Sequence, residues 1–199
     1  MARKKIRKAD IERRTKETDV RVKLDLDGVG RNKINTPIGF FNHLLSSFAR
    51  HGFFNLEVFA KGDLEIDEHH TVEDLGIVLG EAVSKALGDR SGINRFGYTL
   101  IPMDEALARV VIDLSGRPFL VYEAEISQKK RWEFNVNLVE EFFRAFVDKA
   151  GVTLHVKLEY GKDYHHALEA IFKAFGRAMA QAVAMNPRVR SVPSTKGTL

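Results

Sequence analysis

The chain has 199 residues, of which 44% are hydrophobic and 29% charged, a composition typical of a globular protein with a substantial core. It contains no run of about 18 apolar residues and no secretory signal, so we expect a cytoplasmic protein without a membrane span. Because cysteine is absent, disulfides, thiolate metal sites and a cysteine nucleophile are excluded.

The basic residues are concentrated near the start of the chain, although the formal net charge is only +4. Residues 1–16 hold eight Lys or Arg against two acidic residues, whereas the rest of the chain is close to neutral. A pI near 9.3 favours an RNA-binding module. Such a module needs basic and aromatic residues interleaved on one strand face, whereas the basic residues here lie mostly in the N-terminal segment. We therefore expect the basic segment 1–12 to be a solvated tail or a first strand.

The sequence repeats its pattern of elements, and we assign residues 1–93 to the first copy and 94–199 to the second. Each copy opens with a strand of alternating polarity that runs into a glycine turn, and a second strand follows. These segments are 20–28 and 31–36 in the first copy, and 111–116 and 117–122 in the second. Alternation around Asp-Gly or Ser-Gly predicts a β-hairpin in each copy.

A helix, a strand and a second helix complete each copy. The predicted first helices, 40–50 and 138–150, share an apolar stripe at an offset of 98 residues, and we expect Gly52 and Gly151 to end them. The last helices align at an offset of 96. The repeat unit β-β-α-β-α predicts an α+β fold, like domain 2 of ribosomal protein S5, with helices on one face of mostly antiparallel sheets.

Four of the seven histidines lie in two His-His-x-x-Glu clusters at equivalent places in the two copies. The clusters are His69-His70-Thr71-Val72-Glu73 and His165-His166-Ala167-Leu168-Glu169. A helix advances about 100° per residue, so adjacent imidazoles point in different directions while the glutamate lies one turn from both. A single such pair is more often a surface feature, but its duplication favours metal binding. Without thiols, the ligand set suits Mn, Fe, Co, Ni or Zn.

The other three histidines have weaker patterns. His43 aligns with Glu141 in the repeat, so it could add one more ligand, with Glu141 doing the equivalent job in the other half. His51 lies at a predicted helix end, where it could cap the helix or belong to a site. His155 alternates with apolar neighbours on a predicted strand, which indicates a structural role.

Cations and small hydroxyls form a second group, of the kind that binds phosphate. It comprises Arg95, Arg117, Lys173 and the segment Pro193-Ser194-Thr195-Lys196-Gly197. Lys173 lies one turn beyond Glu169, where the first copy has Ile77. A cation at this position is either a surface residue or a substrate contact.

Several longer segments resemble imidazoleglycerol-phosphate dehydratase in its monofunctional form. They are Gly39–Leu45, Gly62–Gly76, Arg95–Gly97, Pro102–Ala106, Asp113–Pro118, Thr153–His155, His165-His166 with Phe172–Ala174, and the terminal Pro-Ser-Thr-Lys-Gly. The resemblance runs from about Arg13 to Leu199. Two positions depart from the family pattern, Asn42 where Asp is common and Ser47 where Gln is usual.

The resemblance implies an enzyme of L-histidine biosynthesis that removes water from D-erythro-imidazole-glycerol phosphate to give imidazole-acetol phosphate. It also implies two Mn²⁺ ions per active site, with other divalent transition metals possible, and a 24-subunit assembly with sites between subunits. No nucleic acid or membrane partner is implied. The implied metal ligands are His43, His69, His70, Glu73, Glu141, His165, His166 and Glu169. The implied substrate and phosphate contacts are Glu17, Arg95, Arg117, Lys173, Ser194 and Lys196.

A hypothesis for the reaction follows from the implied ligands. The substrate's imidazole binds through both ring nitrogens, one to each metal ion, and the resulting imidazolate expels hydroxide. Glu17, which matches the family's acid–base carboxylate, shuttles the proton, and Glu73 and Glu169 complete the catalytic set. A metal-storage scaffold is the main non-enzymatic alternative, and it leaves the phosphate-binding group without a use.

Overall fold

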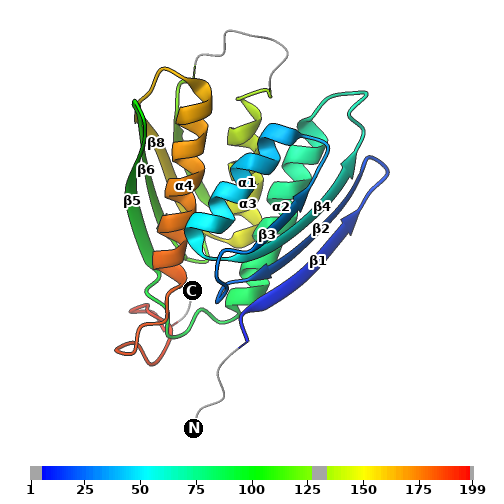
Figure 1. The fold of residues 1–199 in the computed structure, drawn as a ribbon. Coiled ribbons are helices and arrows are strands. Elements are labelled where there is room, and N and C mark those ends of the chain that lie inside the picture. The colour runs from blue at the N-terminus through cyan, green and yellow to red at the C-terminus, as the bar shows by residue number, and fades with distance from the viewer. Residues whose placement is uncertain (1–5, 127–133, 198–199) are drawn as a thin grey trace.

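The structure, a computed structural model, describes residues 6–126 and 134–197, and it has two halves with one order of elements (Figure 1). The first half comprises β1 (Lys8–Arg14), β2 (Thr18–Asp25), β3 (Asn32–Asn35), α1 (Gly39–Gly52), β4 (Asn55–Gly62) and α2 (His69–Leu87). The second half comprises β5 (Phe96–Met103), β6 (Ala106–Asp113), β7 (Phe119–Glu123), α3 (Leu138–Ala150), β8 (Thr153–Tyr160) and α4 (Tyr164–Val183). Each half therefore contains the predicted β-β-α-β-α unit with one further strand ahead of it.

The two sheets have the same topology. Their strand orders are β1-β2-β4-β3 and β5-β6-β8-β7. All pairings are antiparallel except those of β3 with β4 and of β7 with β8, which are parallel. The predicted α+β fold, with duplicated halves and mostly antiparallel sheets, is confirmed.

The predicted hairpins are wrong, because β2 does not pair with β3 and β6 does not pair with β7. The chain between β2 and β3 crosses over the end of β4, where the Asn55 side chain accepts hydrogen bonds from the backbone N–H groups of Val29 (3.0 Å) and Arg31 (3.1 Å). Gly28 is needed at this crossing, since a Cβ there would lie 2.3 Å from the Asn55 backbone nitrogen. The glycine that signals a tight turn in the sequence instead permits a close crossing.

The basic N-terminal segment contains a strand, β1, rather than only a solvated tail. Residues 8–14 all pair with β2. Arg7, just ahead of β1, is buried, forms an ion pair with Asp27 and donates to the carbonyl of Val183 at the end of α4. Its charge therefore lies at a helix C-terminus, where the dipole favours cations.

All four helices lie between the two sheets (Figure 1). Across the boundary between the halves, α2 packs on α3 and α1 packs on α4. The closest approaches use glycines at equivalent positions of the repeat. A Cβ on Gly80 would lie 2.6 Å from the Phe146 carbonyl oxygen, and one on Gly176 would lie 2.4 Å from that of Phe48.

Gly52 does not end its helix by adopting a left-handed conformation. Gly151 does so after α3 (φ 61°), but after α1 this conformation falls on Phe53 (φ 60°). Gly52 is required for packing instead, because a Cβ there would lie 2.4 Å from the Phe54 ring and 3.0 Å from the Gly176 carbonyl oxygen.

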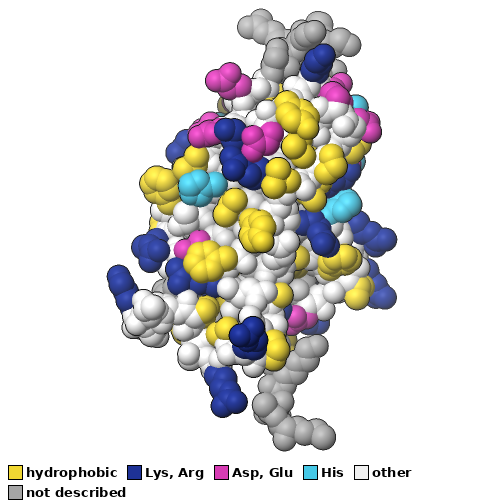
Figure 2. Space-filling view, turned by 90° about the vertical axis from the view of Figure 1, so that its left-hand side faces the viewer, with side chains coloured by type: hydrophobic (Ala, Val, Ile, Leu, Met, Phe, Trp, Pro, Cys, Tyr) yellow, Lys and Arg dark blue, Asp and Glu magenta, His cyan; other side chains and the backbone are white. Residues whose placement is uncertain are grey.

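The outer faces of the two sheets differ in polarity. On the first sheet, charged side chains such as Asp10 and Arg21 form ion pairs across the strands. The second sheet exposes Phe96, Tyr98 and Phe119 at more than half of their surface. Figure 2 shows hydrophobic side chains among charged ones on the β5 side of the molecule.

The helices begin at a common end of the molecule, the top in Figure 1. All eight metal ligands implied by the sequence fall within the first six residues of these helices. The fold therefore gathers residues from four separate segments at one end. None of the helices in the described ranges is both long and apolar enough to cross a bilayer.

Candidate metal centre

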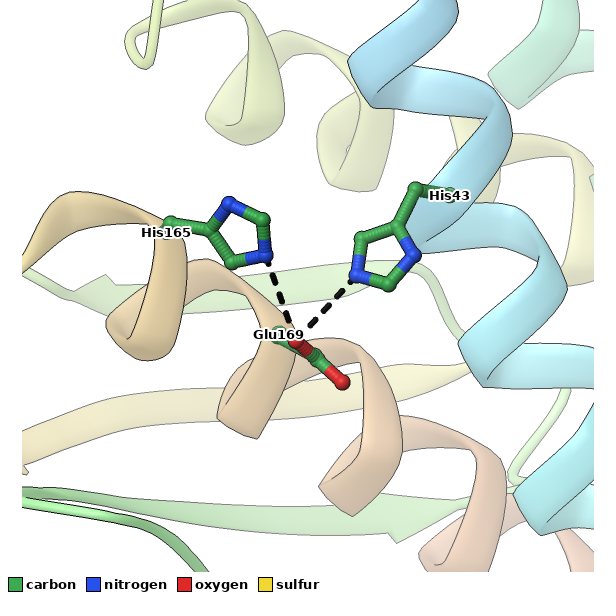
Figure 3. Close-up of side chains that lie close together, drawn as sticks. All are labelled: His43, His165 and Glu169. Atoms are coloured by element: carbon green, nitrogen blue, oxygen red, sulfur yellow. Dashed lines mark ion pairs between the residues drawn. The ribbon is translucent and has the colours of Figure 1, made fainter.

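Two imidazoles and a carboxylate converge between α1 and α4 (Figure 3). Glu169 Oε2 lies 3.1 Å from His43 Nε2 and 3.4 Å from His165 Nε2. The three donor atoms lie within 4.8 Å of one another. Imidazole nitrogens together with a carboxylate oxygen, and no thiolate, are the donor set that suits a divalent transition metal. The geometry of these side chains fits an ion shared among them.

Glu169 is a buried carboxylate, with 8% of its surface exposed. Burial opposes its ionisation, but hydrogen bonds from Lys173 and His43 outweigh burial and lower the pKa of Glu169. Lys173 Nζ lies 2.8 Å from Glu169 Oε1, so one carboxylate oxygen faces the ammonium and the other faces the imidazoles. Lys173 is therefore not a free surface cation, because it helps to hold the Glu169 carboxylate in its ionised form.

The equivalent group in the first half is less complete. On α2, His69 Nε2 lies 3.8 Å from Glu73 Oε2. Glu141, the repeat counterpart of His43, has its carboxylate 3.9 Å from Arg144 Nε on α3. Two groups among the described residues have ligand atoms within 4.8 Å of one another, His43 with His165 and Glu169, and His70 with Glu17 and Asp63. Glu141 belongs to neither of them. Its role as a ligand stays a prediction.

The second histidine of each pair turns away from the first, as the helical spacing predicts. The rings of His69 and His70 are inclined at 87°, and those of His165 and His166 at 78°. His70 Nδ1 lies 3.0 Å from Asp63 Oδ2 and 3.9 Å from Glu17 Oε2. This splitting allows each pair to serve two different ions.

A carboxylate lies within hydrogen-bonding distance of Nδ1 in the second histidine of each pair, His70 and His166, which we call the outward histidines. His166 Nδ1 lies 2.7 Å from Glu105 Oε2, as His70 Nδ1 lies 3.0 Å from Asp63 Oδ2, although Asp63 and Glu105 occupy different positions of the repeat. These hydrogen bonds raise the pKa of His70 and of His166. A carboxylate on Nδ1 orients the ring, so that Nε2 is the nitrogen that could coordinate a metal ion.

Sequence reasoning assigned no role to Asp63 or Glu105. Asp63 lies in the loop between β4 and α2, and no sequence pattern links it to His70 seven residues later. Glu105 could have been found by aligning the first strands of the two copies. At an offset of 88 residues Glu105 falls on Glu17, each in the turn that precedes the second strand of its half.

The implied phosphate contacts lie mostly at the opposite end of the molecule. Arg95 donates to Asp113 (2.6 Å) and to the carbonyl of Pro193 (2.8 Å), which ties it to the C-terminal segment. Its backbone N–H donates to Ala182 at the end of α4. From His165 to Ala182 along this helix is about 26 Å at 1.5 Å per residue. Arg117 follows β6 at the same end, whereas Lys173 stays with the metal centre.

Four further residues are singled out in the sequence, namely Asn42, Ser47, His51 and His155. Asn42 binds Thr36 through both side-chain atoms, so it fixes the loop before α1 rather than the His43 ring. Ser47 is buried. Desolvation and the charge of Lys173 lower the pKa of His51. His155 is exposed on the outer face of its sheet, opposite Val111 and Val121.

Known proteins resemble this chain over almost its whole length. A family model described as imidazoleglycerol-phosphate dehydratase matches residues 36–179. The imidazoleglycerol-phosphate dehydratase of Acetivibrio thermocellus is 54% identical over 193 residues, which cover 97% of this chain and 99% of that relative. The chain belongs to the imidazoleglycerol-phosphate dehydratase family. The resemblance found in the sequence is confirmed.

Further members of this family agree in sequence and in structure. The enzyme of Geobacter metallireducens is 55% identical over 97% of this chain and 99% of its own length. The crystal structure of imidazoleglycerol-phosphate dehydratase from Staphylococcus aureus subsp. aureus N315 has a TM-score of 0.81 and 41% identity, covering 90% of this chain and 99% of that one. The Pyrococcus furiosus enzyme, solved in complex with (S)-C348, has a TM-score of 0.83 and 34% identity, covering 95% of this chain and 100% of that one.

Membership of the imidazoleglycerol-phosphate dehydratase family makes this chain a hydro-lyase of histidine biosynthesis. This assignment replaces the two alternatives that the sequence left open, an RNA-binding module and a metal-storage scaffold.

Glu105→Gln should weaken the acid dependence of stability. Hydrogen bonds from the backbone N–H of Asp163, and then from His166, lower the pKa of Glu105 to about 2. As pH falls below 4.5 the unfolded chain takes up this proton before the folded chain does, so the stabilisation by Glu105 is lost between pH 4.5 and 2. The urea midpoint of metal-free Glu105→Gln should therefore fall less over this window than that of the unsubstituted protein.

Glu57→Gln serves as the matched control, because Glu57 is an exposed carboxylate on β4 that faces Lys23 at 3.6 Å. It should keep the acid dependence of the unsubstituted protein. An acid dependence that is identical in Glu105→Gln and the unsubstituted chain would contradict the anchoring role of this carboxylate.

Proposed function

We propose that this chain dehydrates D-erythro-imidazole-glycerol phosphate to imidazole-acetol phosphate, with divalent transition-metal ions, manganese foremost, held at the amino ends of its helices. The observation that carries the metal dependence is the convergence of His43, His165 and Glu169 from two helices on one point. The implied counterparts in the other half are His69, Glu73 and Glu141. The outward residues His70 and His166 supply the remaining nitrogens.

The donor chemistry supports two ions per active site. His165 with Glu169, and His69 with Glu73, each provide a nitrogen and an oxygen one helical turn apart. When bound, a divalent ion acts as a Lewis acid that lowers the pKa of an imidazole coordinated to it. Asp63 and Glu105 orient the outward imidazoles for coordination through Nε2.

Glu17 is the group that we assign to proton transfer. Its carboxylate lies 3.9 Å from His70 Nδ1, and 58% of the side chain is exposed, so a substrate next to His70 can reach it. Once the hydroxyl group has left the carbon next to the ring, Glu17 Oε2 would take the proton from the second carbon of the side chain. It would then deliver a proton to the carbon next to the ring as the enol becomes the ketone. Such a positioned base contributes about 10²- to 10⁴-fold to the rate.

The proposed active site combines residues of different subunits. His165 and the end of α4 that contacts Arg95 are about 26 Å apart. This distance exceeds the length of one small phosphorylated substrate. Arg95, Arg117, Ser194 and Lys196 of one subunit would therefore bind the phosphate of a substrate whose ring lies at the histidine end of another. The exposed apolar side chains on the second sheet are consistent with self-association, and we propose the 24-subunit assembly of the family. We assign the enzyme to the cytoplasm.

Loss of a metal ligand should lower both metal content and activity. His165→Ala removes one of three converging donors and should weaken Mn²⁺ binding by about 100-fold or more. Elemental analysis after dialysis, paired with an assay for imidazole-acetol phosphate, tests this. His155→Ala removes an imidazole from an outer sheet face and should change neither value. Activity that survives thorough chelation would refute the metal dependence.

Glu17→Gln should lower kcat by about 10² or more, while metal content stays unchanged, because the amide cannot accept the proton. Steady-state kinetics on protein with its metal content measured in parallel check this outcome. An unchanged kcat would remove Glu17 from the mechanism without affecting the metal assignment.

Co-assembly of two inactive variants should restore activity if the site is shared. Glu17→Gln disables the histidine end and Lys196→Ala the phosphate end. In randomly mixed assemblies, about one quarter of the sites combine an intact Glu17 from one chain with an intact Lys196 from another. Activity of co-expressed chains should approach that fraction. Activity no higher than that of the separate variants would mean that both groups come from one chain.

A further inference from the structure

The turn that carries Glu17 is fastened to α2 by a buried carboxylate. Asp74, which follows Glu73 on α2, is 7% exposed. Its Oδ2 accepts a hydrogen bond from the Thr18 hydroxyl and its Oδ1 accepts one from Arg13 Nε at 3.0 Å. Arg13 and Thr18 flank the β1–β2 turn on its two strands. Asp74 therefore fixes both sides of the turn to the helix that carries His70.

Within the turn, hydroxyls continue this connection to Glu17 itself. Thr15 Oγ1 lies 3.2 Å from Thr18 Oγ1 and accepts hydrogen bonds from the backbone N–H of Glu17 (3.1 Å) and of Thr18 (2.9 Å). These hydrogen bonds fix the position of the Glu17 backbone. Its carboxylate, by contrast, takes part in none of these bonds and lies 3.9 Å from His70 Nδ1, in a group with His70 and Asp63.

The second half of the chain fastens its equivalent turn in another way. Glu105, the counterpart of Glu17, accepts backbone N–H bonds from Asp163 (2.9 Å) and Lys162 (3.2 Å) as well as contacting His166. Here the glutamate itself ties the turn to the start of α4. The four fastening residues of the first half are replaced by apolar ones. At offsets of 88 and 96 residues, Arg13, Thr15, Thr18 and Asp74 correspond to Ile101, Met103, Ala106 and Ala170.

Comparing the two halves therefore distinguishes the residues that the fold requires from the residues that the site requires. Both halves build the same sheet, so the polar network around Asp74 is not needed to form the turn. Its distinct effect is to hold the turn without using the Glu17 carboxylate. We propose that Asp74, acting through Thr18 and Thr15, is a positioning residue that sets the Glu17 carboxylate against His70 while leaving it available for proton transfer. This inference rests on the role of Glu17 proposed above.

Thr18→Val tests the inference because it removes the hydroxyl and keeps the size and β-branched shape. We expect kcat to fall by about 10-fold or more, since small displacements of a reacting group are costly, with KM changed less than about threefold. Amide hydrogen exchange at Glu17 and Thr18 should become faster, because their hydrogen bonds to Thr15 are no longer supported by Asp74. Thr18→Ser, which retains the hydroxyl, should restore most of kcat.

A double-mutant cycle distinguishes positioning from general destabilisation. If Thr18 acts through Glu17, then Thr18→Val should cause no further loss in a Glu17→Gln background. Asp10→Asn is the matched control, since it breaks the exposed bonds to Arg21 (2.9 and 2.7 Å) between the same two strands. It should leave kcat and the exchange of the turn unchanged. Asp74→Asn, which keeps the side-chain size, should behave like Thr18→Val in a milder form.

Each contrary outcome has a definite meaning. Unchanged kcat in Thr18→Val, unchanged amide exchange, or an equal further loss in the Glu17→Gln background would overturn the inference while leaving the proposed function intact. Full activity of Glu17→Gln would overturn the proton-transfer role, and the positioning role with it. Metal content measured on every variant separates these outcomes from loss of the ions.

Discussion

The contact of helix backbones across the two halves is the constraint on which the site depends. At Gly176 against Phe48, and at Gly80 against Phe146, there is no room for a Cβ between one helix and the next. These contacts fix how α1 crosses α4 and how α2 crosses α3. Because His43 lies on α1 while His165 and Glu169 lie on α4, the crossing at Gly176 sets the distances among the three donors. A site assembled from separate helices needs such a rigid crossing.

Charge balance explains why Glu169 can be ionised although it is buried. Isolated burial of a carboxylate is unfavourable, yet Lys173 occupies one oxygen and two imidazoles face the other. The lysine stands where the first copy has an apolar residue, so the two halves of the duplicated chain differ in charge at this point. The carboxylate paired with this lysine belongs to the compact group of His43, His165 and Glu169, whereas His69 and Glu73 lie 3.8 Å apart. Divergence after duplication has given related segments separate tasks.

Most of the fold, and the placement of the two His-His-x-x-Glu clusters at equivalent helix starts, could be predicted from the sequence. Both depend on local periodicity and on the repeat, and these are visible without coordinates. The pairing of β3 with β4 could not be predicted, because the crossover depends on a side chain, Asn55, far along the chain. The same limit applies to Glu105, whose contact with His166 joins residues 61 positions apart. The separation of Arg95 from the histidines could not be predicted either, because sequence order does not show that the segment with Arg95 contacts the end of α4 far from His165.

The common starting point of the four helices has a consequence for the charge balance of the chain without bound ions. Carboxylates crowd at this end, among them Asp63, Glu105, Asp163 and Glu169. Their mutual repulsion would be severe without compensation. Peptide dipoles of all four helices direct their positive poles toward this crowd, each worth about 0.3–1 kcal/mol for a nearby anion. The polypeptide itself thus supplies part of the positive potential that the proposed cations would add, so these carboxylates are partly compensated in the ion-free chain.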